Sequence, residues 1–147
     1  MRIFIAVVLA IVAGLAIGRF TAQPVARAQD GCTNDSFKGV YGYVHNGSFY
    51  YTDGSWGAYA AAGKMSADGN GAVSNTETAS FDGIVQRNQN YTGTYTINAD
   101  CTGTANYKDS SGKSIANFDL VVTNGGKDVQ MVEYDSDTMI SGTAKLQ

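Results

Sequence analysis

Residues 90–104, with the sequence NYTGTYTINADCTGT, constrain the fold more than any other stretch because they read as two β-strands joined by a tight turn. Tyr91, Tyr95 and Ile97 alternate with threonines, and a period of two places such a set on one face of a strand. The following Asn98-Ala-Asp100 supplies turn-forming side chains, after which the alternation resumes. The stretch therefore predicts a hairpin with one buried face and one wet face.

The chain after residue 30 repeats this pattern throughout, with no window of helical period longer than one turn. Turns rich in Asp, Asn and Gly separate the alternating segments. The alternation predicts eight strands: Phe37–Val44, Trp56–Ser66, Ala72–Phe81, Arg87–Ile97, Cys101–Tyr107, Ser114–Thr123, Asp128–Tyr134 and Thr138–Lys145.

Eight short antiparallel strands in meander order fit either a sandwich or an up-and-down barrel. The barrel is favoured because the single proline, Pro24, precedes all the predicted strands, so no strand carries the proline that often marks a sheet edge. We therefore expect an all-β fold, an eight-stranded antiparallel up-and-down barrel.

The N-terminus reads as an export signal. Arg2 precedes an apolar run from Ile3 to Gly18, and Ala26-Arg27-Ala28 has the small-x-small pattern of a signal-peptidase site. We expect residues 1–28 to be a cleaved signal peptide and residues 29–147 to be a single domain, secreted or periplasmic. The alternative is an uncleaved membrane anchor, for which the apolar run is slightly short.

The charge balance argues against nucleic acid as a partner. The chain has ten Lys and Arg against thirteen Asp and Glu, and removal of residues 1–28 leaves seven basic residues and a formal charge of −6. Phosphate binding needs clustered basic side chains, and here they are scattered singly. We expect no nucleic-acid partner, and membrane contact only if the leader stays attached.

The two cysteines, Cys32 and Cys101, both follow the predicted leader. In an exported chain they favour a disulfide over a metal site, because no second Cys or His lies near either one at a ligand spacing. Closing a loop of about 70 residues stabilises a fold by about 4 kcal/mol on the chain-entropy model. Neither a metal nor a cofactor is expected.

Two ionisable residues are candidates for chemistry. His45 is the only histidine, so any Ser-His-Asp triad depends on it, but its place before Asn46-Gly47 favours a half-exposed turn residue over a position at the barrel mouth. Glu133 shares its parity with Val129 and Met131. It lies either inside the barrel, where its pKa would be raised and it could orient a ligand, or at a solvated rim.

Aromatic residues concentrate between Phe37 and Tyr59. Core filling accounts for most of those on the predicted strands. The aromatic residues of the predicted first connection cannot all face one core, so some are expected at an aromatic mouth that contacts a ligand or a partner. The candidate ligand-binding residues are Tyr41, Tyr43, Tyr50, Tyr51, Trp56 and Glu133.

Five segments, Phe37–Tyr43, Ala61–Gly71, Tyr91–Tyr95, Asp100–Thr104 and Ser141–Lys145, resemble a group of small, mostly uncharacterised exported bacterial proteins. The resemblance covers nearly all of the chain after the leader. It implies a calycin-like barrel, a shape class that includes lipocalins, avidins and the allene oxide cyclase barrel. It implies fold and export more than activity.

These patterns favour an exported, non-catalytic barrel that binds a small apolar or aromatic ligand, or a partner at its aromatic mouth, because an eight-stranded barrel can hold one small molecule. Two alternatives stay open. One is an enzyme of cyclase or isomerase type, by likeness to the allene oxide cyclase barrel, with Glu133 as the polarising group. The other is a structural envelope protein whose barrel is filled by side chains.

Overall fold

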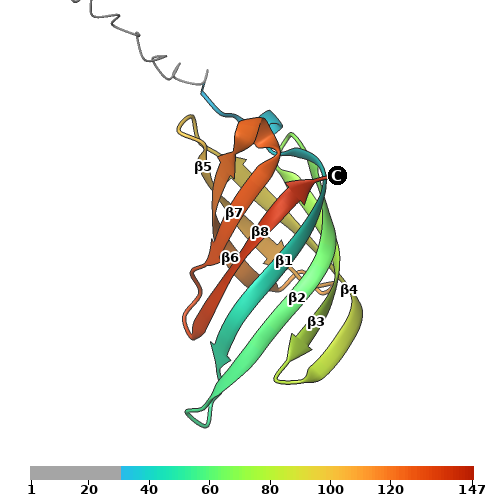
Figure 1. Cartoon of the computed structure of the whole chain (residues 1–147), viewed down its shortest axis with the longest axis vertical. Helices are drawn as coiled ribbons and strands as arrows, with labels where there is room; N and C mark the ends of the chain where they lie inside the picture. Colours follow the sequence, from blue (N-terminus) through green and yellow to red (C-terminus); the bar gives the residue numbers. More distant parts are fainter. Residues whose placement is uncertain (1–30) are drawn as a thin grey trace, which may run out of the picture.

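All eight predicted strands form, and each pairs antiparallel with its neighbours in the sequence (Figure 1). The last strand pairs with the first, so the sheet closes into a barrel in this computed structural model, which describes residues 31–147. The predicted eight-stranded up-and-down barrel is confirmed. The predicted signal peptide lies outside the described residues.

Seven of the predicted strand ranges agree with the structure to within three residues at each end, and the first is extended. Two single turns of 3-10 helix complete the described chain, one before the first strand and one between the sixth and seventh. The elements are η1 (Asn34–Ser36), β1 (Lys38–Tyr50), β2 (Trp56–Asp68), β3 (Ala72–Phe81), β4 (Ile84–Ile97), β5 (Thr102–Lys108), β6 (Ser114–Thr123), η2 (Asn124–Gly126), β7 (Asp128–Glu133) and β8 (Thr138–Leu146).

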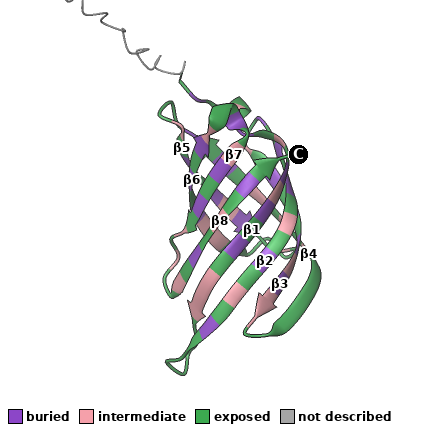
Figure 2. Ribbon diagram, viewed as in Figure 1, coloured by how far each residue is buried: buried purple, intermediate pink, exposed green. Residues whose placement is uncertain are grey.

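Buried and exposed side chains alternate along most of the strands, as a period of two requires (Figure 2). In the second half of β4, Tyr95 and Ile97 are buried while Thr94 and Thr96 face solvent, which confirms the face assignment of the central hairpin. Closure of the sheet then turns all the apolar faces toward one interior.

β1 runs six residues beyond Val44, the predicted end of this strand, which moves the histidine into the sheet. The predicted turn at Asn46-Gly47 is instead regular strand, paired on both sides. Glycine is required there because a Cβ on Gly47 would lie 2.0 Å from the Met139 carbonyl oxygen of β8. The expectation of a half-exposed turn histidine is therefore wrong, since His45 is 5% exposed and points into the barrel.

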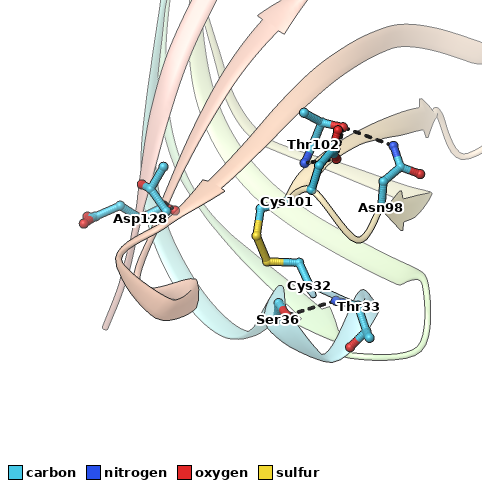
Figure 3. Close-up of a disulfide and its surroundings, with 9 residues drawn as sticks. Cys32, Thr33, Ser36, Asn98, Cys101, Thr102 and Asp128 are labelled. Carbon is cyan, nitrogen blue, oxygen red and sulfur yellow. Dashed lines mark hydrogen bonds between the residues drawn. A yellow bond between two sulfur atoms is a disulfide. The ribbon is translucent and has the colours of Figure 1, made fainter. Parts of the chain in front are cut away.

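The Cys32–Cys101 disulfide ties the segment before β1 to the turn between β4 and β5, with the two Cα atoms 4.9 Å apart (Figure 3). The predicted pairing is confirmed. A disulfide fits an oxidising compartment, extracellular or periplasmic. None of the helical segments between residues 31 and 147 has the length and hydropathy that a membrane-spanning helix needs.

Side chains close the barrel at this same end. The Phe37 ring lies across it, with its centroid 5.0 Å from that of Tyr41 and 4.9 Å from that of Tyr95. The Tyr95 hydroxyl donates to the Phe37 carbonyl oxygen at 2.7 Å and accepts from the Gly69 N–H at 2.8 Å. The Tyr41 hydroxyl donates to the Gly126 carbonyl oxygen at 2.6 Å, which fixes η2 over the same opening.

Replacing Cys32 and Cys101 together by serine should lower the free energy of unfolding by about 4 kcal/mol, because the 69-residue loop is then no longer closed in the unfolded chain. Urea denaturation of the purified proteins measures the change. A loss below about 1 kcal/mol would contradict a main stabilising role for this bond.

Tyr95→Ala should lower the free energy of unfolding by about 3 kcal/mol or more, because it leaves a cavity and removes the hydrogen bonds of the Tyr95 hydroxyl to the Phe37 and Gly69 backbone. Thr94→Ala, on the exposed face of the same strand, is the matched control and should cost under about 1 kcal/mol. Equal losses in urea denaturation would show that the two faces are assigned wrongly.

Candidate functional site

The barrel interior is hollow at the end away from the disulfide. The cavity has a volume of about 540 Å³, and every strand contributes to its wall. Rings and aliphatic groups form most of that wall, and a few polar side chains converge within it. The lining residues are His45, Phe49, Tyr59, Asn75, Glu77, Phe81, Gln89, Tyr91, Tyr107, Asp109, Ile115, Ala116, Phe118, Glu133, Thr138 and Ile140.

Aromatic rings pack against one another around the cavity, so its shape is largely preformed. Phe81 of β3 lies 5.7 Å from Phe49 and 5.1 Å from Tyr59, measured between ring centroids. On the opposite side, Phe118 lies 5.9 Å from Tyr107 in an edge-on arrangement. The imidazole of His45 stacks on Phe118 at 5.1 Å. These pairs hold each other in place and present ring faces and edges to the cavity.

Glu77 of β3 carries a carboxylate into the interior, where the residue is only 7% exposed. The Tyr43 hydroxyl donates to one of its oxygens at 2.5 Å, and the Tyr59 hydroxyl reaches the other at 3.5 Å. Asn75 Nδ2 in turn donates to the Tyr43 hydroxyl at 2.9 Å. Burial raises the pKa of Glu77, while the two phenol hydrogen bonds lower it and so partly offset the cost of burying the charge.

Two cavity-lining residues each have a buried polar atom with no hydrogen-bond partner among the described residues: Nε2 of His45 and Oδ1 of Asn75. Burial lowers the pKa of His45 to about 4, so the imidazole is neutral at physiological pH. A buried polar atom without a partner costs free energy. The wall of the cavity therefore includes two residues whose hydrogen-bonding capacity is not fully used by the described residues.

Glu133, at the end of β7, takes the interior position rather than the solvated rim. The residue is half-buried and lines the cavity. Burial and then the nearby charge of Asp135 raise the pKa of Glu133 to about 7, and the Thr138 side chain lowers it slightly. Tyr59 lines the same cavity as Glu77 and Glu133, and burial and then the charges of these two carboxylates raise its pKa.

The two predicted tyrosines of β1 are core residues, and neither lines the cavity. Tyr41 is buried at the closed end with Phe37. Tyr43 is two residues before His45 on the inward face of β1, toward the closed end. It contacts the site through its hydrogen bond to Glu77. Its hydroxyl remains a donor because burial and the hydrogen bond to Glu77 raise the pKa of Tyr43 well above its ordinary value.

The other predicted aromatic residues lie outside the cavity, around the hairpin turn that joins β1 to β2. Tyr50, Tyr51 and Trp56 are 43%, 36% and 53% exposed. The Tyr50 and Trp56 rings pack edge-on at 5.1 Å. Phe49 is the aromatic residue of this region that does line the cavity. Of the six predicted candidates, only Glu133 is therefore a wall residue.

Sequence reasoning missed the polar residues of β3, although the signal was present. In the predicted strand Ala72–Phe81, Asn75 and Glu77 have the same parity as Val73, Ala79 and Phe81. A carboxylate on the apolar face of an amphipathic strand is the pattern that marks an interior charged group.

Other hollows lie on the outer wall of the barrel, and the largest, of about 460 Å³, spans β1, β6, β7 and β8. It is lined by exposed side chains such as Val44, Val121 and Val132. It holds none of the buried polar groups with shifted pKa values, so the interior cavity is the candidate site. Within residues 31–147, no cluster of three or more His, Cys, Asp and Glu side chains is placed to hold a metal ion.

No protein-family model matches the chain, and no curated protein has a similar sequence. Among solved structures, a de novo designed fluorescence-activating β-barrel is similar, with a TM-score of 0.51 and 15% sequence identity over 78% of this chain and 96% of the designed one. At this identity the likeness shows a shared barrel fold. Membership of the exported calycin-like group stays a prediction.

Replacing Glu133 by glutamine should change how stability depends on pH. Because the folded protein holds the Glu133 proton up to about pH 7, against about pH 4.3 in an unfolded chain, this group makes stability fall as pH rises between those values. Glu133→Gln removes the fall, so the variant gains stability relative to the wild type on going from about pH 4 to about pH 8.

Urea denaturation at the two pH values measures this difference, with Asp119→Asn on the exposed face of β6 as the control. The control should alter stability by the same amount at both pH values. The interior placement of Glu133 is contradicted if the glutamine variant behaves like the control.

Proposed function

We propose that this barrel is a binding protein that holds one small apolar or aromatic molecule in its interior, without chemical turnover. The observation that carries the proposal is a ring-lined cavity whose wall includes a few polar side chains, among them Glu77, Glu133, His45 and Asn75. Apolar walls with a few convergent polar groups are the usual form of a small-molecule site.

The size of the cavity supports the proposal. Ligand pockets have volumes of about 300 to 1,000 Å³, and about 540 Å³ lies within that range. The closed end, filled by Phe37 and its neighbours, forms the floor of the cavity. The shared fold with a designed barrel described as fluorescence-activating also supports use of a barrel interior in this way.

The interior polar groups favour binding over catalysis. Among residues 31–147, the only hydrogen bonds to the Glu77 carboxylate come from the two phenols. His45 is held between the rings of Tyr43 and Phe118, and among residues 31–147 it has no carboxylate partner to activate it as a base. These groups can orient a ligand through hydrogen bonds. The disulfide supports a place of action outside the cytoplasm.

N-phenylnaphthylamine, a neutral aromatic dye that brightens in apolar surroundings, should bind the purified protein, and filling the cavity should abolish the signal. Ala116→Phe places a ring in the space now lined by the small Ala116 side chain and should weaken dye binding at least about tenfold, which corresponds to about 1.4 kcal/mol.

Ala58→Phe, on the exposed face of β2, is the matched control because it adds the same ring outside the barrel. It should leave dye affinity unchanged, and circular dichroism confirms that both variants fold. Absence of dye binding to the wild type, or equal binding by both variants, would overturn interior binding.

A further inference from the structure

The charged groups of the cavity are all acidic. Glu77, Glu133 and Asp109 line it, whereas no lysine or arginine of residues 31–147 does. The one basic residue in the wall, His45, is neutral because burial lowers its pKa to about 4. An anionic molecule would therefore meet negative charge in the cavity without a compensating cation.

The aromatic rings of the cavity wall also attract cations. Aromatic faces carry a negative quadrupole that attracts cations, most strongly where water is excluded. Tyr59 is the ring best placed for this, because its hydroxyl lies 3.5 Å from a Glu77 carboxylate oxygen and Glu133 lines the same cavity. A positive group beside the Tyr59 ring would thus lie near two carboxylates and against an aromatic face.

We propose that the ligand of this cavity carries a cationic nitrogen, and that the site selects an aromatic or heteroaromatic amine over neutral and anionic molecules of the same shape. This inference rests on the proposed function and names the chemical class of the ligand.

The hydrogen-bonding groups of the site match such a ligand. An ammonium group is a donor only, and the carboxylates of Glu77 and Glu133, together with the unpartnered Asn75 Oδ1, are acceptors. Pairing with carboxylates offsets the cost of removing the cation from water. The aromatic part of the ligand then packs against the rings that line the rest of the cavity.

A cation would also relieve the burial of the wall carboxylates. The groups that act on Glu133 are Asp135, in the turn after β7, and the Thr138 hydroxyl of β8, and the charge of Glu133 acts in turn on Tyr59 of β2. The other titratable residues that line the same cavity are His45, Glu77, Tyr91, Tyr107 and Asp109. A bound cation favours the ionised form of Glu133, so its binding should expel a proton where that group is otherwise protonated. Affinity for the cation should then rise with pH.

Three naphthalene derivatives of nearly equal shape test the proposal: naphthylmethylammonium, naphthylmethanol and naphthoate. Each competes with N-phenylnaphthylamine for the purified protein at about pH 7.5 and low salt. The ammonium compound should displace the dye at about tenfold lower concentration than the alcohol, and naphthoate should be the weakest competitor.

Glu133→Gln should reduce the affinity for the ammonium compound by a larger factor than that for the alcohol, so that the preference between the two compounds narrows. Asp119→Asn, an exposed carboxylate on the outer face of β6, is the control and should preserve the preference. The pH dependence of binding tests the proposal in the wild type, without a variant. Affinity for the ammonium compound should rise from about pH 5 to about pH 8, while affinity for the alcohol should stay level.

Equal affinities for the ammonium compound and the alcohol, or tightest binding of naphthoate, would overturn the cationic preference and leave interior binding standing, because the dye still binds. Failure of the dye and of all three compounds to bind would overturn the proposed function, and this inference with it.

Discussion

The pairing of β1 with both β2 and β8 is the constraint on which the rest of the structure depends. From Tyr41 to Phe49, each residue of β1 has a partner on either side, so the first and last strands complete a ring of backbone hydrogen bonds. Closure buries one face of every strand and leaves two ends through which the interior can be reached. One end is closed by Phe37 and braced by the disulfide, so any ligand must use the other.

The interior changes character along the barrel axis. Near the closed end the inward positions hold large apolar groups such as Met65 and Leu120, which leave no room for another molecule. Farther down, the strand neighbours of His45 are Ala61 and Gly142, and a Cβ on Gly142 would lie 2.1 Å from the imidazole. Small residues there make room for a polar ring, beyond which the packing gives way to a cavity. The same region holds Glu77, whose burial is tolerated because phenols donate to it.

The sequence predicts the barrel well because the alternation of apolar and polar residues along each strand is local, and the folded strands keep it as alternating buried and exposed side chains. The hairpin of residues 90–104 and the two cysteines needed only parity and spacing to be placed correctly. The site was harder to predict. Asn46-Gly47 has the residues of a turn and so predicts a turn at His45, yet close approach of β8 explains that glycine. Glu77 has the parity of an inward residue, but a single sequence does not show which phenols reach its carboxylate.

Nuclear Overhauser effects between bound N-phenylnaphthylamine and the isoleucine methyl groups test the central claim, that the barrel holds its ligand in the cavity opposite the disulfide. Ile140 lines the cavity, whereas Ile97 is buried toward the closed end. The account predicts contacts from the dye to the Ile140 methyls and none to those of Ile97. Contacts to Val44 and Val121 on the outer wall, with none to Ile140, would contradict it.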